Sequence, residues 1–277
     1  MTLKNFYIIL LLLFCTLQFA QGPWTQGKNK SYFQAGFSGI FYDRIRIDEK
    51  NASLSSSISD ITSQLYSEYG ITNTLDVSLN IPYKNTTATP KDGSKINSIT
   101  GFSNITIGFK YKIHDQKWKV ATGLFYSTNT IKSNDMIALR TGYDATTILP
   151  YLAVGTSNNK LYYFINLGYG YMSNNYTDYV KIDSEIGYKF LRKTHIILNL
   201  DLKKVVNEEK YFESVSNAIY KSTAIYSDKQ EFYSIGLKLN HEFITNKLGL
   251  NIGAIGAFYV NNLPVAPAIH SGIYYKI

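Results

Sequence analysis

One stretch decides the fold class: residues 75–81 read Leu75-Asp76-Val77-Ser78-Leu79-Asn80-Ile81. Every second side chain is apolar, and the side chains between them are polar. Successive side chains of a β-strand point to opposite faces of the sheet, so this order predicts a strand with one apolar and one polar face. The same alternation occurs in segments 103–113, 195–203 and 231–243.

The alternating segments are long for strands of a soluble protein, which usually have about five or six residues. A tilted strand needs about nine to eleven residues to cross a bilayer, and about twelve such segments fit into this chain. We therefore expect an all-β protein, namely a single transmembrane, antiparallel, up-and-down β-barrel of about 12 strands. The alternative at the level of the fold is a soluble sandwich, because a sheet with one wet face shows the same alternation.

The connections between these segments alternate in length. The short ones are 70–74, 114–117, 157–160, 191–194 and 244–247, and the long ones lie near 44–58, 84–99, 128–144, 173–178, 204–230 and 261–264. Outer-membrane barrels have short periplasmic turns and longer extracellular loops, whereas a soluble sandwich has no reason to keep this parity. The parity favours the barrel. It predicts that the turn 70–74 faces the periplasm and that the loop 204–230 faces outside.

The N-terminus has the features of an export signal. Lys4 gives a positive start, residues 6–17 form a continuous apolar run, and Ala20 is a small residue at a cleavage point. The apolar run is shorter than the roughly 20 residues that a membrane-spanning helix needs. We therefore expect a signal peptide at 1–20 and one outer-membrane β-barrel domain at 21–277.

The composition agrees with a membrane barrel and excludes several other classes. The formal net charge is +8, but the basic residues form no run, so the sequence shows no stripe for nucleic acid. The chain has 24 Tyr and 15 Phe, residues that gather at the membrane interfaces of barrels and are also good strand formers. Cys15 is the only cysteine and lies in the expected signal peptide, so the mature chain has no disulfide.

No arrangement of residues predicts catalysis. The histidines of the mature chain, His114, His195, His241 and His270, are isolated from one another and from any Ser and acid in a recognisable unit. Neither paired strand histidines for a metal nor an acid-rich calcium loop is present. We therefore expect no enzyme activity, no catalytic or metal-binding residue and no cofactor.

The polar faces of the strands predict the residues that line the lumen. This face carries charges of both signs together with small residues such as Gly108 and Gly187, which fits a wet interior. The predicted lumen-lining residues are Gln64, Tyr66, Glu68, Asp76, Asn80, Lys110, Lys112, Asp183, Glu185, Asp201, Lys238 and Glu242. A lattice of salt bridges that fills a narrow barrel and a selectivity lining both explain such residues. Glu68 is our first choice for a lumen residue with a partner, because it lies beside Tyr66 and Tyr69.

Parts of the first third of the mature chain resemble a known family. These parts are Gly22-Pro23-Trp24-Thr25-Gln26-Gly27-Lys28-Asn29-Lys30-Ser31-Tyr32-Phe33-Gln34, Tyr66-Ser67-Glu68-Tyr69-Gly70-Ile71-Thr72-Asn73 with Leu75-Asp76-Val77 and Ile81-Pro82-Tyr83, and Gly101-Phe102-Ser103-Asn104-Ile105-Thr106-Ile107-Gly108-Phe109-Lys110-Tyr111. They resemble the transporter-like outer-membrane barrels named after the meta-pathway of phenol degradation. This resemblance implies that small, often hydrophobic or aromatic, compounds cross the outer membrane.

The expected function is therefore an outer-membrane channel or transporter for small solutes. One alternative is a barrel without transport that acts as a structural or surface-binding protein through the loops 128–144 and 204–230, and another is a lipid-modifying barrel enzyme. The expected partners are outer-membrane lipid and lipopolysaccharide, the barrel-insertion machinery and a small solute of unknown identity, with no nucleic acid. The expected location is the bacterial outer membrane.

Overall fold

The structure, a computed structural model, describes residues 22–207 and 219–277. Its elements are β1 (Ser31–Ile47), β2 (Lys50–Gly70), β3 (Leu75–Pro90), β4 (Asn97–Phe102), β5 (Thr106–Asp115), β6 (Lys119–Ser127), β7 (Ser133–Asn134), the 3₁₀ helix η1 (Asp135–Ile137), β8 (Leu139–Arg140), β9 (Thr147–Ser157), β10 (Leu161–Met172), β11 (Tyr179–Leu191), β12 (Thr194–Val205), β13 (Glu231–Ile244), β14 (Leu248–Asn261), β15 (Leu263–Pro264) and β16 (Ala268–Lys276). None of the described helices is long and apolar enough to cross a membrane. The expected signal peptide at 1–20 lies outside the described residues.

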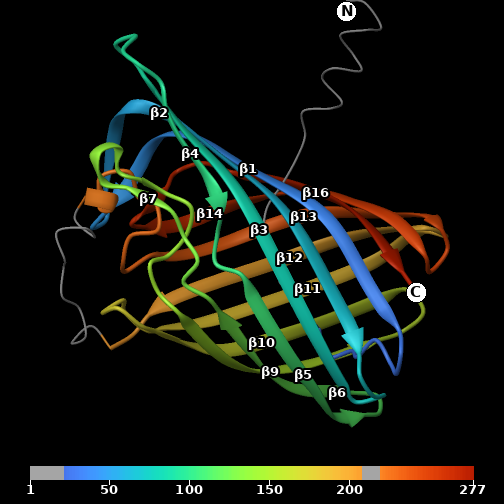
Figure 1. The fold of residues 1–277 in the computed structure, drawn as a ribbon. Coiled ribbons are helices and arrows are strands. Elements are labelled where there is room, and N and C mark those ends of the chain that lie inside the picture. The colour runs from blue at the N-terminus through green and yellow to red at the C-terminus, as the bar shows by residue number, and fades with distance from the viewer. Residues whose placement is uncertain (1–21, 208–218) are drawn as a thin grey trace, which may run out of the picture.

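The long strands form one closed antiparallel barrel (Figure 1). Sequential strands pair with each other, and β1 closes the ring because it pairs with β2 on one side and with β16 on the other. β4 and β5 both pair with β3 and together occupy one place in the ring. This arrangement confirms the expected up-and-down barrel of 12 strands and rules out the sandwich.

The two faces of the barrel follow the alternation in the sequence. Large apolar side chains such as Leu65, Leu79, Phe109 and Leu237 are exposed on the outer face. The polar side chains between them point inward, where many of them are buried. An outer face of this kind suits a hydrocarbon environment, since in water it would leave a large apolar area exposed.

The two ends of the barrel differ. One end, which we call the turn end, carries the connections 71–74, 116–118, 158–160, 192–193 and 245–247. These turns agree with the short connections expected from the sequence. The opposite end, which we call the loop end, carries the connections 91–96, 128–146, 173–178 and 206–230, of which residues 208–218 lie outside the described part of the chain.

Two of the expected loops are largely strand. The expected loop near 44–58 is a continuation of β1 and β2, which join through a two-residue turn at Asp48 and Glu49 with φ of 44° and 65°. The expected loop near 84–99 shortens to 91–96, because β3 runs to Pro90. Both loop predictions were wrong for the same reason. These Ser-, Thr- and Ile-rich segments have no continuous apolar face, so alternation did not identify them as strands, although they extend the hydrogen-bonded pairing.

The loop end has a core of its own inside the barrel. Tyr42, Ile45 and Ile58 from β1 and β2 pack with Leu139 and Ile225 from two of the connections. The Tyr42 hydroxyl donates to the carbonyl oxygen of Thr223 at 3.1 Å. The connection 128–146 and residues 219–230 therefore fold inward over the strands and narrow the lumen at this end.

Candidate solute pathway

The N-terminal segment, residues 22–30, crosses the inside of the barrel at the turn end. The Trp24 ring meets the inward-facing Phe164 of β10 edge to face, with ring centroids 5.9 Å apart. On the other side of the lumen the backbone N–H of Gln26 donates to Asp76 Oδ2 of β3 at 2.9 Å. The segment thus connects β10 with β3, which β9, β6 and β5 separate in the ring, and lies across part of the opening.

Two glycines allow this segment to pack against the end of β2. A Cβ atom on Gly70 would lie 1.9 Å from the carbonyl oxygen of Gly27, and Gly27 itself has a φ of +89°. The backbone N–H of Asn29 donates to the carbonyl oxygen of Gly70 at 2.8 Å. Any side chain at Gly70 would therefore push the segment away from the wall.

A buried cluster of charges holds the segment in place. Lys110 Nζ of β5 lies 3.6 Å from Glu68 Oε1 of β2 and 3.6 Å from Asp76 Oδ2 of β3. Glu68 also accepts hydrogen bonds from the Tyr66 hydroxyl, at 2.6 Å, and from the Gln26 side-chain amide. Glu68, which was expected to have a partner, therefore has three. They are Lys110 on β5, Tyr66 on β2 and Gln26 in the N-terminal segment.

A second set of charges lies on the opposite wall. Lys238 Nζ lies 2.9 Å from Glu185 Oε2, and Lys181 Nζ lies 3.1 Å from Asp183 Oδ1 and 3.6 Å from Asp201 Oδ1. These pairs join β11, β12 and β13 across the inner face. Each partly buried ion in these pairs has an opposite charge nearby, which offsets the cost of removing it from water.

Several inner-face glycines make room for tyrosine rings. A Cβ atom on Gly187 would lie 2.0 Å from the Tyr162 ring, and one on Gly123 would lie 2.4 Å from the Tyr151 ring. Each ring therefore lies directly over a glycine of the neighbouring strand. The small residues expected to leave room for water thus serve here to accommodate aromatic side chains.

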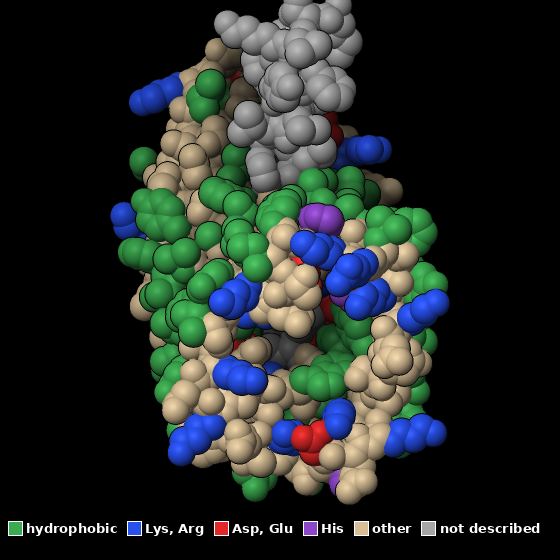
Figure 2. All heavy atoms as spheres, turned by 90° about the vertical axis from the view of Figure 1, so that its right-hand side faces the viewer, with side chains coloured by type: hydrophobic (Ala, Val, Ile, Leu, Met, Phe, Trp, Pro, Cys, Tyr) green, Lys and Arg blue, Asp and Glu red, His purple; other side chains and the backbone are tan. Residues whose placement is uncertain are grey.

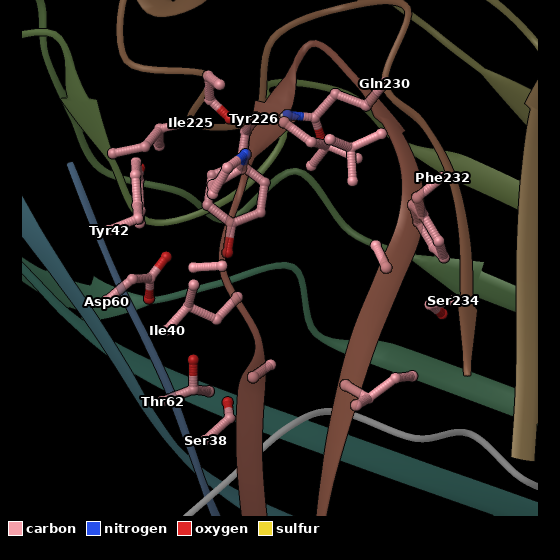
Figure 3. Close-up of a pocket in the computed structure, with 18 of the residues that line it drawn as sticks. Ser38, Ile40, Tyr42, Asp60, Thr62, Ile225, Tyr226, Gln230, Phe232 and Ser234 are labelled. Atoms are coloured by element: carbon pink, nitrogen blue, oxygen red, sulfur yellow. Dashed lines mark hydrogen bonds between the residues drawn. The ribbon is translucent and has the colours of Figure 1, made fainter. Parts of the chain in front are cut away.

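The larger of two cavities inside the barrel has a volume of about 330 Å³. It lies toward the loop end, between the barrel wall and residues 219–230 (Figure 3). It is lined mainly by apolar atoms. Figure 3 shows the Tyr226 ring between the wall that carries Ser38, Ile40 and Thr62 and the wall that carries Phe232. Its volume and apolar lining are those of a site for a small, largely apolar molecule.

A charged pair forms the polar side of the larger cavity. Lys84 Nζ donates to Asp60 Oδ2 at 2.7 Å and also to the Tyr226 hydroxyl. Burial raises the pKa of Tyr226 to about 12, so its phenol is neutral at physiological pH. The pair on β2 and β3 therefore holds Tyr226, which belongs to the connection 219–230, inside the lumen.

A smaller cavity, of about 190 Å³, lies next to the larger one. Its lining is Asn80, Pro82, Ser103, Asn104, Thr106, Ser127, Tyr143, Thr147, Met172, Tyr179, Lys203 and Tyr226. Tyr143 and Tyr226 line both cavities. These two rings therefore form the partition between the cavities.

The break between β4 and β5 positions Tyr143. Asn104, within this break, accepts a hydrogen bond at Oδ1 from the backbone N–H of Tyr143 at 2.7 Å. Its Nδ2 donates to the carbonyl oxygens of Tyr143 and Thr128, at 2.8 and 2.7 Å. One side chain thus ties the connection 128–146 to the barrel wall.

The connection that carries Tyr226 is tied down in a similar way. Asp228 accepts hydrogen bonds from the backbone N–H and the hydroxyl of Thr177, at 2.7 and 2.8 Å. Gln230 Nε2 donates to the carbonyl oxygen of Ala224 at 2.9 Å. Since buried carboxylates without partners are costly, these contacts fix the inward position of the loop.

Of the residues that were predicted to line the lumen, the structure buries Glu68, Asp76, Asn80, Lys110, Glu185 and Glu242. They do not form one site. Glu68, Asp76 and Lys110 form the cluster beneath the N-terminal segment, and Lys112 lies near the turn end with Asp115. Asp183, Glu185, Asp201 and Lys238 belong to the opposite wall. Asn80 lines the smaller cavity and Asp201 the larger one, while Gln64, Tyr66 and Glu242 line neither.

The family model described as "Putative MetA-pathway of phenol degradation" matches residues 17–264. The chain belongs to this family. None of the curated protein sequences matches it. The match extends far beyond the first third of the chain, on which the resemblance in the sequence rests.

Solved structures share the fold of this member of the phenol-degradation family. The COG4313 outer membrane channel from Pseudomonas putida F1 has 12% identity and a TM-score of 0.70, with 95% of this chain and 100% of that chain covered. The NanC porin has 14% identity and a TM-score of 0.54, with 89% and 100% covered. The KdgM porin has 9% identity and a TM-score of 0.51, with 87% and 98% covered.

The fold also gathers the basic residues of this family member at the turn end. Lys and Arg side chains ring the opening there (Figure 2). They come from the turns and strand ends: Lys28, Lys30, Lys112, Lys117, Lys119, Lys160, Lys189, Arg192, Lys193, Lys247 and Lys276. The charge that is scattered in the sequence therefore forms a positive rim, which attracts anions to this mouth.

Sequence reasoning missed the residues of the partition. Tyr143 and Tyr226 lie in loops, where alternation says nothing about direction. Asn104 was quoted only as part of a strand-like motif, although it lies in the break between β4 and β5. No local sequence signal predicts that Tyr143 and Tyr226 form the partition or that Asn104 holds Tyr143. Both roles depend on where the inward connections end.

Proposed function

We propose that this protein is an outer-membrane channel that admits small solutes through a narrow lumen with two cavities in series. The observation that carries this proposal is the partition of Tyr143 and Tyr226 between the two cavities. A barrel with a purely structural role would not require two adjoining cavities that are separated by two loop residues. Membership of the phenol-degradation family and the likeness in fold to channels and porins support the proposal.

The larger cavity indicates the kind of solute. Its lining includes Ile40, Ile225, Phe232 and Ile255 together with the Lys84–Asp60 pair. An apolar cavity with a few polar groups is suited to a compact, partly hydrophobic molecule and not to a hydrated ion. The finer proposal is therefore a channel for small hydrophobic or aromatic compounds, without enzymatic activity.

The proposal includes an orientation and partners. The turn end faces the periplasm and the loop end faces outside, as in other outer-membrane barrels. The exposed apolar side chains of the outer face contact outer-membrane lipid, with lipopolysaccharide at the loop end, and the insertion machinery assembles the barrel. The surface-binding alternative would use the same loops, but the inward positions of Tyr143 and Tyr226 favour a role inside the barrel.

Reconstitution tests the proposal. The purified barrel is inserted into planar bilayers, and the same preparation is placed in liposomes whose swelling reports uptake of small phenolic and sugar solutes. We expect small single-channel currents and faster swelling with the phenolic solutes. A preparation that migrates as a folded barrel on an unboiled gel, yet neither conducts nor causes swelling, would overturn the proposal.

A further inference from the structure

Lys203 differs from four other lysines on the inner face of the barrel. Lys84, Lys110, Lys181 and Lys238 each have a carboxylate oxygen within 3.6 Å. Within the described part of the chain, no salt bridge is formed by Lys203, although it is only 8% exposed. A buried ammonium group without a counter-ion is costly, so the surroundings of this residue require an explanation.

Two aromatic rings contact Lys203 instead. Its Nζ lies 5.0 Å from the centre of the Tyr143 ring and 4.4 Å from the centre of the Tyr179 ring, and it donates to the Tyr143 hydroxyl at 3.4 Å. Ring faces attract a cation, but they supply no net negative charge. The ammonium group thus keeps the capacity to bind an anion.

Lys203 lines the smaller cavity, whose opposite wall is polar. Asn80, Thr106 and Ser127 lie on this wall, and Asn80 is 3% exposed with no hydrogen-bond partner at Oδ1. The amide of an asparagine can turn to present either its oxygen or its N–H groups. The cavity therefore combines a cation, an unsatisfied amide and aromatic rings around one space.

The dimensions of the cavity restrict the ligand. Its volume of about 190 Å³ is below the roughly 300–1,000 Å³ of sites for drug-sized ligands. Met172 and the tyrosine rings give it an apolar side, which a fully hydrated inorganic anion does not use. A compact organic anion with an apolar body of about one ring fits both sides.

We propose that the smaller cavity is a binding site for a small organic carboxylate, with Lys203 as the counter-ion and Asn80 as a hydrogen-bonding partner. The positive rim at the turn end (Figure 2) attracts anions to the mouth of the same lumen. This inference refines the proposed channel function by naming the charge of one class of solute. Binding can nevertheless be measured without any transport.

Equilibrium dialysis with radiolabelled benzoate tests the site in the detergent-solubilised, full-length mature barrel. Benzamide and benzylammonium serve as neutral and positive probes of the same shape, and acetate tests the contribution of the ring. We expect benzoate to bind at least about tenfold more tightly than each of them, the effect of one charge-assisted hydrogen bond or of one buried ring. Equal binding of benzoate and benzamide would overturn the proposal, and so would equal binding of benzoate and acetate.

Three variants locate the binding to Lys203. Lys203→Met removes the charge and should lower benzoate affinity to the level of benzamide, whereas Lys203→Arg keeps the charge and should retain part of the affinity. Lys204→Met is the matched control, because it removes the same charge from the next residue, whose side chain pairs with Glu231 outside the cavity. Migration on unboiled gels verifies that each variant is folded. Unchanged benzoate affinity in Lys203→Met would refute the assignment.

The result separates this inference from the proposed function. A barrel that conducts but does not bind benzoate overturns the carboxylate site and leaves the channel intact. A barrel that binds benzoate through Lys203 but never conducts supports the carboxylate site and overturns the channel function.

Discussion

The rings of Tyr143 and Tyr226 meet edge to face, with centroids 5.1 Å apart and an interplanar angle of 76°. Tyr143 lies in the inward connection 128–146 at the loop end, and Tyr226 lies in the inward residues 219–230. Asn104 fixes the first and the Lys84–Asp60 pair fixes the second. The pair of rings that lines both cavities therefore belongs to the loops and not to the barrel wall.

Substitution of Tyr226 with Ala should join the two cavities. We expect single-channel conductance in planar bilayers to rise by about twofold or more, since a constriction dominates the resistance of a narrow pore. Tyr226→Phe is the control, because it keeps the ring and removes only the hydroxyl that Lys84 contacts. If the Ala variant conducts like the wild type, the partition does not limit passage.

Deletion of residues 22–28 from the mature chain should widen the turn end. This segment places Trp24 against Phe164 and Gln26 against Asp76 inside the barrel. We expect a larger conductance and more current noise, because the opening loses an ordered obstacle. A smaller change, Trp24→Ala, should shift conductance in the same direction. Currents identical to those of the full-length chain would show that the segment does not obstruct the lumen.

Lys110→Met should destabilise the barrel by about 3–5 kcal/mol, because it leaves the buried carboxylates of Glu68 and Asp76 without their shared cation. The free energy of unfolding can be measured by urea titration in lipid vesicles. Lys117→Met, at an exposed position in a turn, should change it by less than about 0.5 kcal/mol. Equal stability of the two variants would mean that the buried cluster contributes little.

Gly187→Ala should also destabilise the barrel, by about 1–3 kcal/mol, because the new methyl group overlaps the Tyr162 ring. Gly256→Ala is a strict control, since a Cβ atom there meets nothing within 4 Å. The double variant Gly187→Ala with Tyr162→Leu should recover part of the loss in the same urea titration. Similar stabilities of the two single variants would contradict this account of the inner-face glycines.

Labelling of single cysteines in whole cells tests the orientation. Cys15 is the only cysteine and lies in the expected signal peptide, so a new cysteine in the mature chain is unique. Ser94→Cys lies in the connection 91–96 at the loop end, and Lys160→Cys lies in a turn at the other end. A membrane-impermeant maleimide should label the first in intact cells and the second only after lysis. The reverse pattern would invert the assignment.

The local pattern of the sequence was sufficient for the barrel. The alternation at 75–81 and 231–243 predicted strand faces, and the turns predicted at 70–74 and 157–160 lie where the structure has them. The lengths of β1, β2 and β3 beyond the expected loops were missed, because strands above the membrane zone carry no apolar face to reveal them. Their pairing depends on the partner strand and not on composition.

The contacts between the motifs of the family could not be predicted in the same way. The stretches 22–34 and 66–77 both resemble the family, but only the structure shows them in contact, through Gln26 with Glu68 and Asp76. Lys203, Tyr143 and Asn104 likewise acquire their roles from neighbours far away in the chain. None of these three positions differs locally from an ordinary strand or loop residue.

The sequence by itself determined the class of the fold, a strand number of about 12 and the faces of the strands that alternate clearly, because side-chain direction in a strand depends only on its own alternation. The tertiary structure decided which charges pair, where the basic side chains gather and which loop residues divide the lumen. These features depend on strand register and on the inward path of two connections. Both are properties of the closed barrel, in which residues distant in the chain become neighbours.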